Sequence, residues 1–407
     1  MKRQRPSAPP DATPAFAGVD THKKEHVLAL LDEHERLIGT YSFPTTEQGC
    51  RNLACTIGST DVVVGVEGTG SYGARLARVL DDAGFNVIEV IRPKREQRWH
   101  GKSDPLDAIA AAENVAAEKG VPYRRRDGIV ARLRHVLTIY EQLNRQQTQT
   151  SNCVCSLMTS DGFYDWSEYL SMTTKNALCA LAKTRKPDLK DLPVVRAAKH
   201  WVRTEKDLAG LEKEMLSLVS QIYPNLICEP GVGPVSAAIL ATMVGEDISL
   251  IESEAAFAKM CGVIPIPASS GSTSGHMRLN RGGNRSANAA LYRIAVVRMA
   301  TDKQTQEYIA NKMAKGSTKR DAIRCLKRYI ARRIYKLMKA KQVPLPDTAE
   351  LRLRRENLGL SQRALASAAD LKVSAIGQAE RKGYAPRVVL EAYQKTLDEL
   401  EKVLDAL

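Results

Sequence analysis

The sequence predicts a mixed α/β domain at the N-terminus, followed by domains built mainly of helices. Residues 14–120 alternate short apolar runs, which are typical of strands, with amphipathic segments, which are typical of helices. Beyond them the strand signals disappear and helical patterning takes their place. A chain of 407 residues also exceeds one ordinary hydrophobic core, so we expect several domains.

The elements of the first domain can be assigned in order. Three apolar runs open it, and the second and third flank a short polar turn, as in a β-hairpin. The next helix begins with a Thr-x-x-Gln capping pattern, and the last helix has Pro in its first turn and Gly at its end. The predicted strands are 15–20, 25–32, 36–43, 61–67 and 86–91, and the predicted helices are 45–57, 74–84 and 104–120. The order βββαβαβα predicts a sheet covered on both faces, and it is also the order of the ribonuclease-H-like fold.

The other segments differ in character from the α/β domain. Residues 1–13 form a basic, proline-rich tail that we expect to be disordered. Residues 121–222 are predicted to be a helical connector, 223–342 a second, mainly helical domain, and 343–407 a small helical domain that starts with the linker VPLPD. In the connector, apolar residues recur at spacings of three and four, at Leu208, Leu211, Met215, Leu218 and Ile222. Such a seam is typical of a coiled coil, and equally of a helix that packs within its own domain.

The charge balance points to a polyanionic partner. The 60 Lys and Arg residues exceed the 46 Asp and Glu residues, which gives a net charge of +14 and favours nucleic acid over a membrane surface. The eight cysteines are scattered without a CxxC pair, as expected for reduced thiols in the cytoplasm. No signal peptide and no membrane-length apolar run is visible, so we expect neither a secreted nor an integral membrane protein.

Four carboxylates stand where a metal site could form. Asp20 ends the first strand, Glu67 ends the central strand before a glycine turn, and Asp104 and Asp107 open a helix. Sites in open α/β sheets gather beyond strand ends, and carboxylates at i and i+3 of a helix can face the same side. Such hard oxygen ligands suit Mg²⁺, and two ions about 4 Å apart would support phosphoryl transfer.

The same residues also allow a simpler interpretation. Asp-Pro-x-Asp is a good helix start, and an aspartate at a strand end is often a turn residue. The combination of all four, in this order of elements, favours the metal site. A basic segment that includes Lys102 precedes the acidic helix, which suits phosphate delivery, although an ordinary solvated loop would look alike.

The second domain carries a Ser-, Gly- and Arg-rich segment at 261–288, which enters a helix near Arg285. Ser269 and Ser270 precede a glycine there, and Arg278, Arg281 and Arg285 could hold a phosphodiester. A serine needs a base or a metal to attack, and no Ser/His/Asp set is present, which argues against an esterase. From the residues alone, a linker loop is the simpler interpretation. The helix at 318–342 is rich in cations, Arg324 and Arg328 among them, and favours nucleic acid over a merely solvated surface.

Several motifs together resemble one family over residues 15–340, the DEDD transposases of bacterial insertion sequences (the IS110/IS1111 group). The motifs are AGVDTHK, VVGVEGTGSYG, RWHGKSDPLDA, PGVGPVSAAILATMVGEDISLI, AFAKMCGVIPIPASSG and RLNRGGNRSANAALYRIA. The resemblance implies a RuvC-like, ribonuclease-H-like domain whose Mg²⁺-binding quartet is Asp20, Glu67, Asp104 and Asp107. It also implies a C-terminal transposase domain with a nucleophilic serine, which falls on Ser270, with Ser269 as the alternative.

The family further implies how such a chain works. A bridge RNA encoded by the element pairs with donor and target DNA, and Ser270 attacks a DNA phosphate to give a phosphoserine intermediate before strand exchange. The quartet of one subunit acts with the serine of another, which implies a homodimer or homotetramer with 121–222 as a coiled-coil connector. Two rival functions remain open: a RuvC-like metal-dependent junction-resolving endonuclease and a non-enzymatic DNA-binding regulator.

The C-terminus departs from the family pattern. Residues 343–407 look like a phage-repressor-type helix-turn-helix domain in which Ser361 caps the second helix. Residues 372–381 would be the recognition helix, with Lys372, Ser374 and Gln378 toward base edges. The alternative is a plain helical dimerisation tail.

Overall fold

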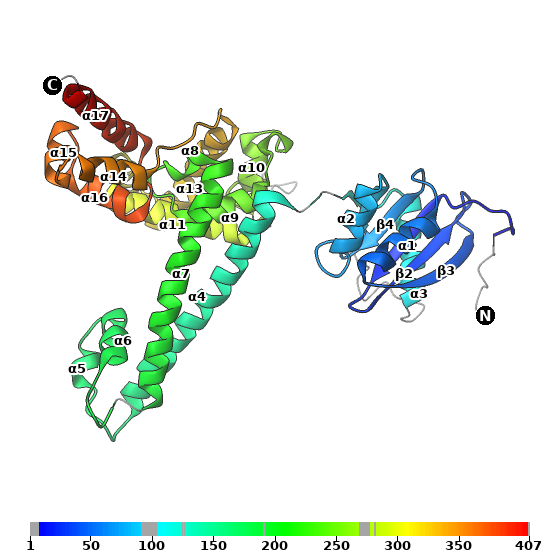
Figure 1. Cartoon of the computed structure of the whole chain (residues 1–407), viewed down its shortest axis with the longest axis horizontal. Coiled ribbons are helices and arrows are strands. Elements are labelled where there is room, and N and C mark those ends of the chain that lie inside the picture. Colours follow the sequence, from blue (N-terminus) through cyan, green and yellow to red (C-terminus); the bar gives the residue numbers. More distant parts are fainter. Residues whose placement is uncertain are drawn as a thin grey trace. The chain divides into compact units, whose positions relative to one another are not determined.

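The computed structural model describes residues 8–90, 104–123, 125, 127–189, 192–267, 277–280 and 282–405. It divides the chain into two compact units, residues 1–126 and 127–407, whose elements are labelled in Figure 1. None of the helices in the described ranges is both long and apolar enough to cross a lipid bilayer.

The first unit is built on a six-stranded mixed sheet in the order β3-β2-β1-β4-β5-β6. β1 pairs antiparallel with β2 and parallel with β4, which places the ends of β1 and β4 at the same edge of the sheet. The bounds are β1 (Phe16–Thr21), β2 (Glu25–Leu31), β3 (Leu37–Pro44), β4 (Val63–Glu67), β5 (Asn86–Val90) and β6 (Val121–Pro122). The five predicted strands are confirmed, whereas the two residues of β6 are too few to show a pattern.

Helices cover both faces of this sheet, as the sequence predicts. Side chains of α1 (Glu47–Ile57) and α2 (Ala74–Asp82) share a core with one face, and α3 (Asp104–Ala116) packs on the other. Thr46, one residue later than predicted, caps α1 by accepting a hydrogen bond from a backbone N–H. This arrangement is consistent with the ribonuclease-H-like order.

The residues of β1 alternate between the two faces and fix the distance to α3. Ala17 and Val19 are buried in the core beneath α1 and α2. Gly18 faces α3 so closely that a Cβ built on it would lie 2.2 Å from the backbone nitrogen of Ala112. Because residues i and i+2 share one face of a strand, Asp20 lies on the α3 side as well.

Gly18→Ala should therefore lower the free energy of unfolding of the first unit by about 3 kcal/mol or more, because backbone atoms of α3 would have to move. Gly210→Ala is the matched control, since a Cβ at Gly210 in α7 meets nothing within 4 Å and should be tolerated or slightly stabilising. Urea denaturation followed by circular dichroism measures both. Equal unfolding midpoints for Gly18→Ala and the wild type would contradict the close packing of α3 on β1.

The second unit begins with two long antiparallel helices, α4 (Gly128–Ser160) and α7 (Pro193–Ile222), which lie side by side in Figure 1. At one end they share a core with α5 (Ser167–Leu170) and α6 (Thr174–Lys183). At the other end they join the larger core of the helical domain that follows.

The apolar seam predicted in the connector is filled within the chain. Met215 and Leu218 are buried in a core shared with α4 and with the helix α9 (Pro234–Val244), and Leu211 and Ile222 pack against that core. Of the two interpretations that the sequence leaves open, packing within the helix's own domain is the one the structure shows for these residues.

The remaining elements build that domain and the C-terminal tail. The domain contains α8 (Pro224–Ile227), α9 (Pro234–Val244), η2 (Ile248–Leu250), α10 (Glu254–Met260), the paired strands β7 (Pro265–Pro267) and β8 (Met277–Leu279), α11 (Arg285–Thr301), α12 (Lys303–Ala314) and α13 (Lys319–Lys339). The tail contains α14 (Thr348–Asn357), α15 (Gln362–Ala368), α16 (Val373–Lys382) and α17 (Arg387–Asp405). Ser361 caps α15, as predicted.

The tail has its own small core but is also fixed to the domain before it. Arg355 and Glu380 form a buried ion pair of 2.7 Å between α14 and α16. The Arg387 guanidinium donates hydrogen bonds to the side chain of Asn225 and to the carbonyl of Val343. Arg387 of the tail thus contacts both the domain and the first residue of the predicted linker.

Candidate functional site

Two buried carboxylates end neighbouring parallel strands. Asp20 at the end of β1 is fully buried, and Glu67 at the end of β4 is 6% exposed. The Thr21 hydroxyl donates a 2.7 Å hydrogen bond to the Glu67 carbonyl and ties the two strand ends together. Glu67 shares a strand face with Gly65, where a Cβ would lie 2.9 Å from a backbone oxygen of α3, so both carboxylates lie on the α3 side.

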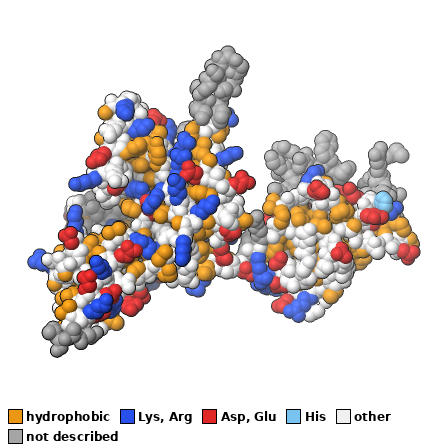
Figure 2. All heavy atoms as spheres, turned by 90° about the horizontal axis from the view of Figure 1, so that it is seen from above, with side chains coloured by type: hydrophobic (Ala, Val, Ile, Leu, Met, Phe, Trp, Pro, Cys, Tyr) orange, Lys and Arg blue, Asp and Glu red, His pale blue; other side chains and the backbone are white. Residues whose placement is uncertain are grey.

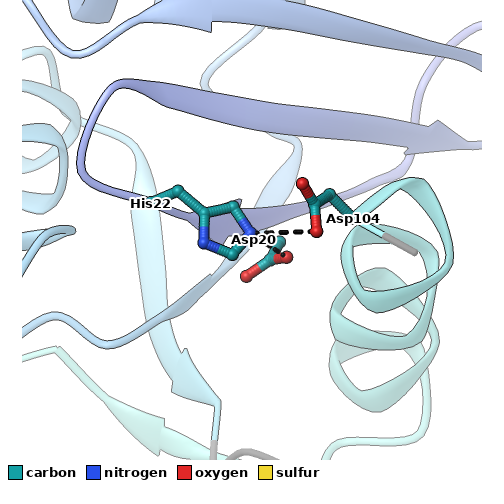
Figure 3. A group of neighbouring side chains, drawn as sticks. All are labelled: Asp20, His22 and Asp104. Carbon is teal, nitrogen blue, oxygen red and sulfur yellow. Dashed lines mark ion pairs between the residues drawn. The ribbon is translucent and has the colours of Figure 1, made fainter. Parts of the chain in front are cut away.

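The first turn of α3 supplies the other two acids, Asp104 and Asp107. Figure 3 shows that His22 forms one ion pair with Asp20 and another with Asp104. The Nε2 atom of His22 lies 3.0 Å from Asp20 Oδ2 and 3.2 Å from Asp104 Oδ1. One possible ligand atom from each of these three residues lies within 4.8 Å of the others.

His22 is a site residue that the sequence interpretation does not single out. A usable signal was present: His22 follows Asp20 by two residues, so an extended chain puts both side chains on one face. His26 on β2 is fully buried, and burial together with the charge of His22 lowers its pKa to about 4.

The charges of the other three acids all affect the pKa of Asp20. Burial raises the pKa of Asp20, and the negative charges of Glu67, Asp107 and Asp104 raise it further, while His22 opposes them. Ionised Asp20 is therefore costly in the folded chain unless positive charge is nearby. Carboxylate oxygens are the ligands that hard divalent cations prefer, so the residues at this sheet edge fit such an ion.

Four predicted site residues lie outside the described residues: Lys102 of the first unit, and Ser269, Ser270 and Arg281 of the second. β7 and β8 pair antiparallel, with Ile266 opposite Arg278, so the two ends of the intervening segment lie together.

The predicted arginines nearby are on the surface. Arg278 is exposed on β8, and Arg285 is exposed at the start of α11, where the sequence predicts the helix to begin. Such positions leave both guanidinium groups accessible to a phosphodiester.

The predicted cations of α13 and the tail are also accessible. Arg328 is exposed, and Arg324 is partly exposed while pairing with Asp321 at 2.7 Å. Figure 2 shows Lys and Arg side chains spread over the visible face of the second unit. On the tail the candidate base-reading side chains are all exposed, at Lys372, Ser374 and Gln378.

Clustered carboxylates at the edge of an α/β sheet can hold a divalent metal ion. A transposase family model matches residues 17–160, and a model described as transposase IS116/IS110/IS902 family matches residues 225–310. The chain belongs to this IS110 family of insertion-sequence transposases. Its substrate is therefore DNA.

Two relatives span most of the chain. An uncharacterized 42 kDa protein of insertion element IS900 from Mycobacterium paratuberculosis is 22% identical over 378 residues, which are 78% of this chain and 94% of the relative. An uncharacterized 43.6 kDa protein of insertion element IS110 from Streptomyces coelicolor is 24% identical over 366 residues, 76% of this chain and 90% of the relative.

Proposed function

We propose that this transposase joins DNA strands through a covalent serine intermediate, with Ser270 as nucleophile and the four carboxylates holding Mg²⁺ at the same phosphate. The observation that supports this most is the contact of Asp20, His22 and Asp104 at the sheet edge. A divalent ion bound there would offset the negative charge of the attacked phosphate.

The covalent step needs no outside source of energy, because each bond that forms replaces a bond of the same kind. The Ser270 oxygen forms a bond to phosphorus while the bond from phosphorus to the leaving sugar oxygen breaks. The serine proton passes to a base, and the leaving oxygen gains a proton. One phosphate ester replaces another, so the reverse attack by a new strand reseals the DNA and frees the serine.

The proposed partners are DNA, a guide RNA and further copies of this chain. A bridge RNA pairs with donor and target DNA, and the net charge of +14 supports binding of both polyanions. A homodimer or homotetramer brings the carboxylates of one subunit to the serine of another.

The tail adds a DNA reader of helix-turn-helix type. The helix α16 presents Lys372, Ser374 and Gln378 to solvent, and these side chains suit the major groove of duplex DNA. The buried Arg355–Glu380 pair holds α16 on the tail's core, so the exposed face of the helix is fixed.

The direct test is to trap the adduct. End-labelled DNA carrying the element end is incubated with the protein and its co-purified RNA, then resolved on a denaturing gel. We expect a protein–DNA adduct that needs Mg²⁺ and does not form when the protein is treated with ribonuclease before the DNA is added. Cleaved DNA without an adduct would instead indicate the junction-resolving endonuclease, and binding without cleavage would indicate the regulator.

A further inference from the structure

A cationic pocket of about 420 Å³ lies between α11 and α13 of the second unit. Its volume is within the range of ordinary ligand sites. The lining residues are Tyr292, Lys319, Arg320, Ile323, Arg324 and Lys327. Four of these six side chains are cations, so the pocket selects for an anion.

The positive charge of the pocket is only partly compensated. Arg324 pairs with Asp321, whereas no ion pair to Lys319 or Arg320 is found among the described residues. Lys327 is partly buried, and its Nζ donates a 2.7 Å hydrogen bond to the side chain of Asn288. Burial and the neighbouring Arg324 lower the pKa of Lys327, so a bound anion would relieve a real electrostatic cost.

The pocket also offers a stacking surface. The Tyr292 side chain is 49% exposed, and Ile323 lies beside it in the lining. An exposed aromatic ring among cations is the arrangement with which proteins hold single-stranded nucleic acid, because the base stacks and the phosphates pair. A base-paired duplex presents its phosphates but keeps the faces of its bases stacked.

We propose that this pocket binds one nucleotide of a single-stranded polynucleotide, with the base on Tyr292 and the flanking phosphates on Arg320 and Arg324. The inference rests on the proposed function, since the strand is one that the transposase handles during strand exchange or guidance. DNA and RNA share this chemistry, and the experiment separates them.

Asn288 links the pocket to the segment that contains the predicted nucleophile. Its side-chain nitrogen donates hydrogen bonds to the carbonyls of Cys261 and Gly262, at 3.0 and 2.9 Å, while its oxygen accepts from Lys327. These carbonyls belong to the turn that leads into β7, one strand of the hairpin that flanks Ser270. Asn288 thus joins Lys327 in the pocket to the turn that precedes β7.

Fluorescence anisotropy tests the pocket with labelled single strands of about 12 nucleotides, as DNA and as RNA of one sequence, and with a matching duplex. We expect Arg320→Gln/Arg324→Gln to bind at least one of the single strands about tenfold more weakly. The slope of log affinity against log salt concentration should also fall by about one to two, because fewer counterions are released on binding. Tyr292→Ala should weaken that binding about fivefold, and Tyr292→Phe should restore it because the ring remains. Lys303→Gln/Lys315→Gln removes two exposed charges outside α13 and outside the pocket lining, so it is the matched control and should bind as the wild type does.

Each outcome bears on the proposal. A loss confined to the DNA strand or to the RNA strand supports it and identifies the occupant. Unchanged affinity in the arginine variant, or an equal loss for the duplex, overturns it while the serine reaction stands. Failure of the wild-type protein to bind any polynucleotide would overturn the proposed function itself, and the pocket with it.

Discussion

Asp20→Asn should lower adduct formation and strand exchange roughly a thousandfold or more, while the first unit becomes more stable. The amide keeps the shape of the side chain but loses the charge that a divalent ion needs at the centre of the four acids. Asp20 is buried and its Oδ2 lies 3.0 Å from Nε2 of His22, so the substitution removes its charge from the interior of the candidate site. Quantitative gel assays of adduct and joined product measure the effect.

The stability gain follows from the direction of the pKa shift. Burial and neighbouring acids raise the pKa of Asp20 in the folded chain, so its contribution to stability is present below the pKa of the unfolded chain and is lost as pH rises through the folded pKa. At neutral pH the wild type therefore bears a cost that the asparagine lacks. Without divalent ion, Asp20→Asn should melt at a higher temperature than the wild type.

Two comparisons make this result specific. Mg²⁺ should raise the melting temperature of the wild type and leave that of Asp20→Asn unchanged, because only the folded wild type binds the ion. Glu33→Gln removes the same charge from an exposed position in the first unit and should change neither stability nor activity. Full strand exchange by Asp20→Asn would show that this carboxylate has no part in the reaction.

Ser270→Ala should abolish the covalent adduct and lower strand exchange by a similar factor, since no oxygen remains to attack the phosphate. Ser269→Ala is the matched control one residue away, and it should retain the adduct. The same denaturing gel measures both. The reverse result would assign the nucleophile to Ser269, and adduct formation by the double variant would contradict a serine in this segment.

Mixing the two inactive variants tests the sharing of one active site between subunits. In a dimer of the two variants, the Ser270→Ala chain keeps its carboxylates and the Asp20→Asn chain keeps its serine. The one complete site therefore combines groups from different chains. We expect an adduct to reappear on the Asp20→Asn chain, which a larger tag distinguishes. An adduct on the Ser270→Ala chain would exclude Ser270 as the attacking group.

The arrangement of the acids could be predicted from local patterns. Asp20 and Glu67 end apolar runs, and the Pro of the acidic helix marks its first turn, so strand ends and helix start were both visible in the sequence. The close approach that unites them depends on Gly18 against the backbone of α3. That contact joins residues far apart in the sequence, and no local pattern reports it.

In the connector, a clear local pattern does not identify the packing partner. A seam of apolar residues with a spacing of three and four has the same form whether a neighbour in the same chain or a partner covers it. Met215 and Leu218 are covered from within, by elements whose positions the seam itself does not specify. His22 was missed for a third reason, because a histidine beside a strand end is chemically informative only once Asp104 is known to lie across from it.

The proposed function requires that the acidic group at the ends of β1 and β4 bind a divalent ion. Anomalous diffraction from crystals soaked in Mn²⁺ would locate such an ion. We expect a peak within bonding distance of carboxylate oxygens of Asp20 and Asp104, and no such peak in Asp20→Asn crystals. If the protein joins DNA in Mn²⁺ but shows no peak at these carboxylates, they are not the metal site of the reaction.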